Sequence, residues 1–150
     1  MEVISIAVST RKGTPKVPVE EATVLANHGL KGDAHSGQWH RQVSLLVLED
    51  IKQARRRGLD VSYGAFGENI ATRGIDWSRV PEGLKLIIGD SVELEITQKG
   101  KVCRSRCAIY YRAGACIMPK KGVFARVTRG GKIRQGDRIT MTETKTGLNQ

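Results

Sequence analysis

The sequence predicts a mostly-β domain with one or two short helices, and three observations support this prediction. Short runs in which apolar and polar residues alternate recur along the chain, as is typical of half-buried strands. A Gly-Asp turn that leads into a strand occurs twice, at Gly89-Asp90 and at Gly136-Asp137. Residues 48–57 form the best helix candidate, because they combine start and stop signals.

The first third of the chain begins with an expected strand at residues 3–9, which alternate as V-I-S-I-A-V-S. Residues 11–18 hold one glycine, two prolines and three basic residues, so we expect an exposed loop. Residues 19–26 fit either a strand or a short irregular segment. Residues 27–39 contain three glycines, two histidines and Asp33, and this glycine content predicts a shaped loop instead of a helix.

A strand at residues 43–47 is expected to lead directly into the helix at residues 48–57. Acidic residues fall in the first turn of this helix and arginines in its last turn, which complements the helix dipole. Gly58 follows as a stop signal. The residues expected to face the core are Leu48, Ile51 and Ala54.

The second half of the chain continues with a loop at residues 64–69 and a series of short strands. These are expected near Ile70 and at residues 84–88, 92–96, 107–111, 122–128 and 133–141. The two Gly-Asp turns belong to an internal repeat, in which L-x-x-G-D-x-V-x-L is echoed by I-x-x-G-D-x-I-x-M. Glycine supplies a positive φ and aspartate bonds to nearby backbone N–H groups, so the repeat favours a barrel of short strands.

The 150 residues suit a single domain, residues 1–150, with a core from about residue 3 to residue 141 and a frayed tail at residues 142–150. The N-terminus lacks the pattern of a signal peptide, and the sequence has no apolar run long enough for a membrane span. We therefore expect a cytoplasmic protein with no membrane partner.

The charge balance is strongly basic, with 25 Lys and Arg residues against 15 Asp and Glu residues, a net charge of +10. This balance favours an anionic partner, which can be a nucleic acid, a phosphate-bearing cofactor or an acidic protein. Aromatic residues make up only 5%, which is sparse for a surface that stacks nucleic-acid bases. A basic surface that serves only solubility is the alternative.

The segment Val102-Cys103-Arg104-Ser105-Arg106-Cys107 carries the strongest chemical signal. Three cysteines without an export signal indicate reduced thiols. Neighbouring guanidinium groups favour the thiolate, which is the nucleophilic and metal-binding form, and with Ser105 they can hold a phosphate. Equally, Cys103 and Cys107 can alternate into a core while the arginines point outward. The spacing of these cysteines does not match a zinc knuckle.

Other candidate groups are weaker when they are taken one by one. Residues 29–35, G-L-K-G-D-A-H, form a loop with a basic, an acidic and a titratable side chain. Arg41 precedes a strand, and Asn69 ends a short loop with an amide that can both donate and accept. Trp39 and Trp77 are expected to pack in the core or at the mouth of the barrel.

Taken in order, these pieces resemble the MOSC domain, which is named after the C-terminal domain of molybdenum-cofactor sulfurases. The matching motifs are G-L-x-G-D-x-H at residues 29–35, R-Q-V-S-L at 41–45, G-E-N at 67–69, L-x-x-G-D at 86–90, R-S-x-C at 104–107, G-V-F-A-R-V at 122–127 and G-G-x-I-x-x-G-D at 130–137. Their shared order covers residues 3 to 141 and is most similar to short stand-alone bacterial members.

The resemblance implies a MOSC-like β-barrel that binds the molybdenum cofactor, a molybdenum-bearing pterin with a phosphate tail. It implies that Cys107 ligates molybdenum or carries sulfur, and that Arg104, Ser105 and Arg106 meet the phosphate or the pterin edge. Arg41, His35 and Asn69 are weaker carry-overs to the same pocket. Arg104 stands where short relatives are expected to have a histidine, which argues against a general base beside Cys103, while Cys116 is a plausible second thiol.

Three functions follow as hypotheses. The first is a molybdenum-cofactor binding protein in cofactor maturation, sulfuration or transfer, whose partners make or accept the cofactor and whose metal could also be tungsten. The second is a small reductase of N-hydroxylated compounds that needs an external electron donor. The third is a basic β-barrel that binds nucleic acid or a protein, although the low aromatic content and the lack of an RNA-binding motif oppose nucleic acid.

Overall fold

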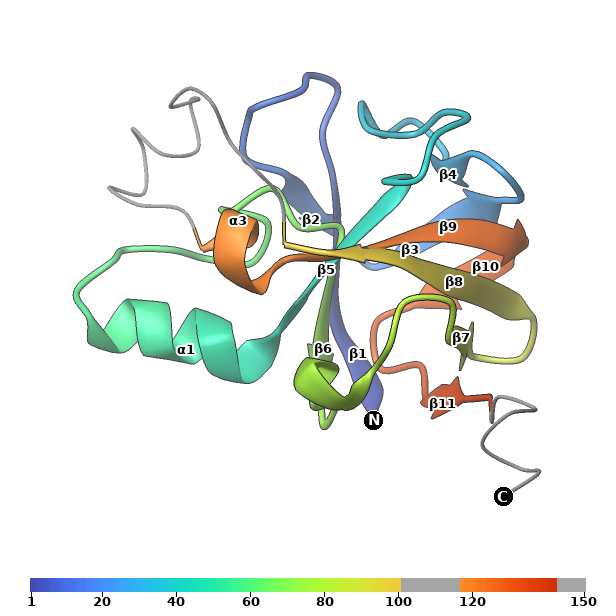
Figure 1. Cartoon of the computed structure of the whole chain (residues 1–150). Coiled ribbons are helices and arrows are strands. Elements are labelled where there is room, and N and C mark those ends of the chain that lie inside the picture. The colour runs from blue at the N-terminus through green and yellow to red at the C-terminus, as the bar shows by residue number, and fades with distance from the viewer. Residues whose placement is uncertain (101–116, 143–150) are drawn as a thin grey trace.

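The computed structural model describes residues 1–100 and 117–142, and in these ranges the strands form two sheets (Figure 1). The larger, eight-stranded sheet has the order β11 (Ile139–Met141), β7 (Lys85–Ile88), β8 (Val92–Lys99), β9 (Val123–Arg129), β5 (Val43–Val47), β6 (Ile70–Arg73), β1 (Glu2–Val8) and β2 (Val17–Val19). The smaller sheet has the order β10 (Gly131–Arg134), β3 (Glu21–Leu25) and β4 (Gly29–Leu30). The helical elements are α1 (Leu48–Arg56), the 3-10 turn η1 (Trp77–Arg79) and α3 (Met118–Lys121).

The predicted mostly-β class with few short helices is confirmed. The barrel is not closed in the described residues, because β11 and β2 lie at opposite ends of the strand order of the larger sheet. Within the described ranges, β5 and β6 pair in parallel and the other strand pairs are antiparallel. The predicted strand at residues 107–111 lies outside the described residues, as do residues 143–150 of the frayed tail predicted at residues 142–150.

Helix α1 connects the parallel strands β5 and β6, and it begins and ends where its charges and its following glycine predict. Gly58 has a φ of 95°, a conformation that glycine adopts without steric cost. The three residues expected to face the core, Leu48, Ile51 and Ala54, are buried. No helix in the described part of the chain is both long and apolar enough to span a membrane.

Strand β5 lies at the centre of the packing, since all five of its residues are buried. Side chains alternate between the faces of a strand, so Val43, Leu45 and Val47 join a large apolar cluster shared with both sheets. Leu46 points to the other face and packs with Ile51 of α1 in a second cluster. The two apolar clusters fix β5, and with it the start of β5, where Arg41 and Gln42 lie.

The two Gly-Asp turns of the internal repeat connect their strands differently, one within a sheet and the other between the two sheets. Gly89 has a φ of 63° and joins β7 to β8 in a hairpin, whereas Gly136 has a φ of 92° and carries the chain from β10 in the small sheet to β11 in the large sheet. The turns also pack together, because the backbone N–H of Gly89 donates to the carbonyl oxygen of Arg138 at 2.9 Å. The same local motif thus serves once within a sheet and once between sheets.

The expectation of an exposed loop at residues 11–18 is wrong in part. Residues 17–19 form the edge strand β2, and Lys16 is buried with only 3% of its surface exposed. Pairing of β2 with β1 brings Lys16 beside Ser9 at the end of β1, where it meets buried acceptors. This burial depends on a contact between separate segments, which the local composition of the loop does not show.

Gln42 yields a test of the fold. This side chain is fully buried, and its Oε1 accepts a hydrogen bond of 2.8 Å from the backbone N–H of Val127. We expect Gln42→Leu to lower the free energy of unfolding by about 1–3 kcal/mol, because the N–H of Val127 loses its partner inside the protein. Urea denaturation measures this change.

The matched control is Gln135→Leu at an exposed glutamine, whose Nε2 donates to the carbonyl oxygen of Ile4 at 3.0 Å. A change within about 0.5 kcal/mol is expected there. Equal losses of unfolding free energy in the two variants would show that the buried hydrogen bond of Gln42 stabilises the fold no more than the exposed bond of Gln135.

Candidate functional site

The site residues predicted from the sequence fall into two groups. Cys107, Arg104, Ser105 and Arg106, like Cys103 and Cys116, lie outside the described residues. The structure describes His35, Arg41 and Asn69, which come from the loop after β4, the start of β5 and the start of β6. His35 contacts a buried group that the sequence did not indicate, the ammonium group of Lys16, whereas Asn69 bonds to Asp33 and Arg41 lies over the ring of Trp39.

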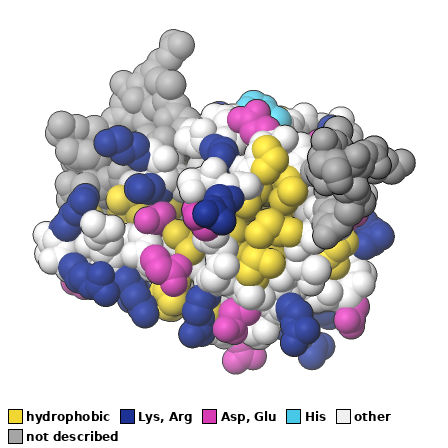
Figure 2. Space-filling view, turned by 60° about the horizontal axis from the view of Figure 1, so that its bottom comes forward, with side chains coloured by type: hydrophobic (Ala, Val, Ile, Leu, Met, Phe, Trp, Pro, Cys, Tyr) yellow, Lys and Arg dark blue, Asp and Glu magenta, His cyan; other side chains and the backbone are white. Residues whose placement is uncertain are grey.

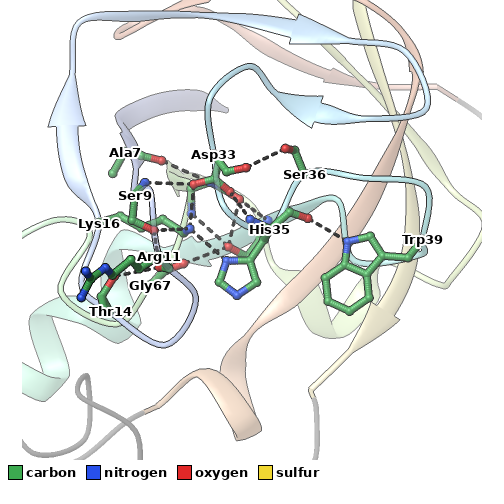
Figure 3. Close-up of polar contacts among 12 residues, drawn as sticks. Ala7, Ser9, Arg11, Thr14, Lys16, Asp33, His35, Ser36, Trp39 and Gly67 are labelled. Atoms are coloured by element: carbon green, nitrogen blue, oxygen red, sulfur yellow. Dashed lines mark hydrogen bonds and ion pairs between the residues drawn. The ribbon is translucent and has the colours of Figure 1, made fainter.

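Lys16 is the centre of a compact polar cluster, shown in Figure 3, which we call the Lys16 cluster: Ser9, Lys16, Asp33 and His35. Its Nζ lies 2.7 Å from Oδ1 of Asp33, and both side chains are 0% exposed. The same Nζ lies 3.1 Å from Oγ of Ser9 and 3.0 Å from Nδ1 of His35. An ion pair, a hydroxyl and an imidazole therefore share one buried site.

The carboxylate of Asp33 organises the backbone around it. Its Oδ1 accepts from the backbone N–H of Ser9 at 3.0 Å, and its Oδ2 accepts from the backbone N–H of His35 at 3.2 Å. Burial by itself would raise the pKa of Asp33, but the hydrogen bond and charge of Lys16, with bonds from Ser9 and Asn69, outweigh burial and hold that pKa below its ordinary value. Asp33 is thus ionised at neutral pH and fastens its loop to the end of β1.

Trp39 links His35 to Arg41. Its indole N–H donates to the carbonyl oxygen of His35 at 2.7 Å, and its ring lies nearly parallel to the imidazole, at 11° with centroids 6.5 Å apart. The guanidinium carbon of Arg41 lies 4.7 Å from the centroid of Trp39, and Nζ of Lys12 lies 5.5 Å from it. The expected packing role of Trp39 therefore includes orienting cations through its ring face.

Arg41 carries an unused donor in the described part of the protein. Its guanidinium carbon lies 5.7 Å from the ring of Phe124 as well as over Trp39, so two aromatic rings hold the group. Its Nε is buried, and no hydrogen-bond partner is present among the described residues. A planar guanidinium held in this way is suited to bind a carboxylate or phosphate through two parallel bonds.

Asn69 makes buried hydrogen bonds that hold together the strands around the site, and we call these strand-to-strand contacts the frame. It is 1% exposed, its Oδ1 accepts from the backbone N–H of Ser44 at 3.0 Å, and its Nδ2 donates to the carbonyl oxygen of Ala7 at 3.1 Å. These bonds connect the start of β6 with β5 and with β1. The amide of Asn69 therefore positions the strands that carry the Lys16 cluster.

Glu68 is a second buried carboxylate beside this frame. It is 1% exposed, and it accepts from the backbone N–H groups of Gly64 at 2.7 Å and Phe66 at 3.2 Å. Burial raises the pKa of Glu68 above its ordinary value, against the opposing effect of these bonds and of the charge of Lys16. The sequence motif G-E-N thus supplies a carboxylate that shapes its own loop, and no local sequence signal indicates that this carboxylate is buried.

Strands β8 and β9 flank the segment of the chain that contains Cys107, and β9 also contacts Arg41. Strands β8 and β9 pair down to Lys99 and Val123, and the backbone N–H of Gly100 donates to the carbonyl oxygen of Gly122 at 2.7 Å. Phe124, the next residue of β9, is the one that packs on Arg41. Lys99, Gly122 and Val123 also line a cleft with Val47 at the end of β5.

A cleft of about 650 Å³ lies at the other end of the parallel strands β5 and β6. Its lining includes Val47 at the end of β5 and Gly74 just after β6, whereas Arg41 and Asn69 precede these strands. Lysines and carboxylates both line this cleft, so its charge does not select a class of ligand.

Together, these features define a small mostly-β protein with a polar site that contains a buried ion pair, an imidazole and a guanidinium over an aromatic ring. A model of the MOSC domain family matches residues 32–140, so the chain belongs to the MOSC domain family. This confirms the family predicted from the ordered motifs.

Solved structures show the same fold. The YuaD protein from Bacillus subtilis superposes with a TM-score of 0.78 at 18% identity, over 96% of this chain and 96% of that chain. YiiM from Geobacillus stearothermophilus gives 0.71 at 21% identity, over 97% and 77% of the two chains. YiiM from Escherichia coli gives 0.67 at 21% identity, over 96% and 71%. No curated protein matches this chain.

Gly64 yields a test of how the backbone supports Lys16. Gly64 has a φ of 86°, and a Cβ at this position would collide with the carbonyl oxygen of Lys16. Gly83 has a φ of 94° with open space around it. We expect Gly64→Ala to destabilise the protein by about 1–3 kcal/mol more than Gly83→Ala, because only the first adds overpacking to the conformational cost. Urea denaturation of both variants gives the difference, and equal costs would contradict the close approach.

The lowered pKa of Asp33 predicts a specific dependence of stability on pH. A carboxyl whose pKa is lower in the folded protein stabilises the fold above its unfolded pKa of about 3.9, and this stabilisation is lost as the pH falls through the folded pKa. We therefore expect the stability difference between the wild type and Asp33→Asn to be large at pH 6 and to shrink toward pH 3. Urea denaturation at several pH values measures it.

Asp60→Asn, at an exposed carboxylate, is the control and should follow the wild type across this range. A difference between the wild type and Asp33→Asn that stays constant with pH would contradict a stabilising charge on Asp33.

Proposed function

We propose that this protein binds the molybdenum cofactor and acts in its maturation, sulfuration or transfer, with Cys107 as metal ligand or persulfide carrier. Membership of the MOSC family supports a role connected with this cofactor. The basic character of the chain, with a net charge of +10, supports an anionic ligand. The partners would be proteins that make or receive the cofactor.

The observation that carries the proposal is the state of Arg41. A guanidinium held between two aromatic rings, with a buried Nε that has no partner among the described residues, leaves donors for a ligand. Phosphate is a strong acceptor with the geometry to match a planar fork of N–H groups. The phosphate tail or the pterin edge of the cofactor supplies such acceptors.

The described residues fit the organic, anionic part of the cofactor. No group of three or more metal-ligating side chains occurs within residues 1–100 and 117–142. The proposal therefore assigns the metal to the thiolate of Cys107, a soft ligand that suits molybdenum. When bound, the cofactor would supply a metal centre that can carry sulfur or exchange electrons. Arg41 would hold the anionic part, and the Lys16 cluster would keep His35 beside it.

A general nucleic-acid surface receives less support. On the face shown in Figure 2, basic and acidic side chains alternate around an apolar patch instead of forming a continuous basic stripe. Several basic side chains are also engaged in surface ion pairs, for example Arg126 with Glu95 at 2.8 Å and Lys132 with Glu21 at 3.0 Å. Local neutralisation of this kind lowers the potential that a polyanion would meet.

Cofactor retention tests the proposal. The purified protein is mixed with free cofactor and desalted, and the bound pterin is measured by fluorescence and the metal by elemental analysis. We expect Arg41→Gln to weaken pterin binding about tenfold or more, because an ionic hydrogen bond is lost. Cys107→Ala should lower the ratio of metal to pterin.

The matched control is Arg126→Gln, which removes an exposed arginine whose side chain is paired with Glu95. It should retain the cofactor like the wild type. Equal retention by the wild type, Arg41→Gln and Cys107→Ala would overturn the proposed function.

A further inference from the structure

The contact between the ammonium group of Lys16 and the imidazole of His35 bears on which ring nitrogen of His35 carries the proton. Within the described part of the chain, three acceptors surround Nζ of Lys16: Oδ1 of Asp33, Oγ of Ser9 and Nδ1 of His35 (Figure 3). An ammonium group has three hydrogens and no lone pair, so it meets each of these atoms only as a donor.

The charge state of Lys16 follows from its buried partner. The carboxylate of Asp33 lies 2.7 Å away, and both side chains are fully buried. A neutral lysine would leave the ionised Asp33 without a counter-charge inside the protein, which is strongly unfavourable. Lys16 is therefore an ammonium ion, and Nδ1 of His35, 3.0 Å away, accepts a hydrogen bond through its lone pair.

A neutral imidazole that accepts at Nδ1 carries its proton on Nε2, at the far edge of the ring. We propose that Lys16 is a positioning residue that holds His35 in this Nε2–H form, so that His35 meets the anionic ligand as a hydrogen-bond donor and not as a general base. The identity of the ligand rests on the proposed function, whereas the position of the proton does not.

The surroundings fix the ring as well as the proton. Asp33, the ion-pair partner of Lys16, also accepts from the backbone N–H of His35, and Trp39 donates to the backbone carbonyl of His35. The near-parallel ring of Trp39 lies beside the imidazole. Because Arg41 lies on the same Trp39, a donor from His35 and a fork of donors from Arg41 are held by one indole. An acceptor-rich anion, such as the phosphate or the pterin edge, fits such a pair.

Nuclear magnetic resonance tests the proton position directly in the protein without cofactor. Long-range correlations between ring protons and ring nitrogens separate a protonated from an unprotonated imidazole nitrogen. With ¹⁵N-histidine and His35→Gln for assignment, we expect His35 at pH 7.5 to show a proton on Nε2 and none on Nδ1. In Lys16→Met the ring should lose this single form and show a mixture of proton positions.

The matched control is Lys12→Met, because Lys12 contacts the ring of Trp39 but makes no contact with His35 in the described structure. It should leave the signals of His35 unchanged. A wild-type ring with its proton on Nδ1, or an unchanged pattern in Lys16→Met, would overturn the inference. If Lys16→Met does not fold, a wild-type ring with its proton on Nδ1 still overturns the inference.

Cofactor retention supplies a second readout. We expect His35→Ala to weaken binding about tenfold to a hundredfold and His35→Gln, which keeps an N–H donor, to recover most of that loss. No recovery in His35→Gln would overturn the donor role. A proton on Nε2 without any retention of cofactor by the wild type would overturn the proposed function and leave the Lys16 inference standing.

Discussion

The ion pair between Lys16 and Asp33 is the interaction on which the described site depends. It joins the segment before β2 to the loop after β4, 17 residues further along the chain. Loss of one partner from such a pair costs about 3–5 kcal/mol, because a buried charge remains without compensation. The intact pair is worth much less, since an apolar replacement often serves stability equally well. The main contribution of the ion pair is therefore to position Ser9 and His35, which both bond to it, and not to stabilise the fold.

Much of the fold could be predicted because its signals are local. Helix α1 was predicted within one residue, since its acidic start, basic end and Gly58 all act within a single turn. Strand β5 was predicted with its observed bounds, because four of the five residues that precede that helix are apolar. By contrast, the two Gly-Asp turns have the same local sequence, yet one changes sheets. Which strand a segment pairs with is decided by distant residues, so the open sheet could not be derived from the motif.

The candidate site likewise contains some residues that could be predicted from the sequence and others that could not. The family resemblance assigns His35, Arg41 and Asn69 to one pocket, and in the described structure His35 contacts Lys16 and Trp39, Asn69 bonds to Asp33, and Arg41 lies over Trp39. Lys16 itself was missed, because nothing in the local sequence distinguishes it from the exposed Lys12. The buried frame formed by Asn69 and Glu68 was also invisible, since it depends on bonds to backbone groups of other segments. Cys107 stays a prediction.

The distribution of charge explains what the described residues can contribute to chemistry. Lys16 and Asp33 neutralise one another, so in the proposed function Arg41 would supply the positive charge for a ligand and His35 would add a donor without a charge. Glu68 is the other carboxylate of the frame, but its two oxygens are bound within its own loop and it is sealed from solvent. A proton acceptor exposed to the ligand is therefore lacking among the groups of the frame and the Lys16 cluster. This arrangement would suit holding and orienting an anion, as the proposed function requires, with the bond making left to the bound group or to the proposed thiol chemistry of Cys107.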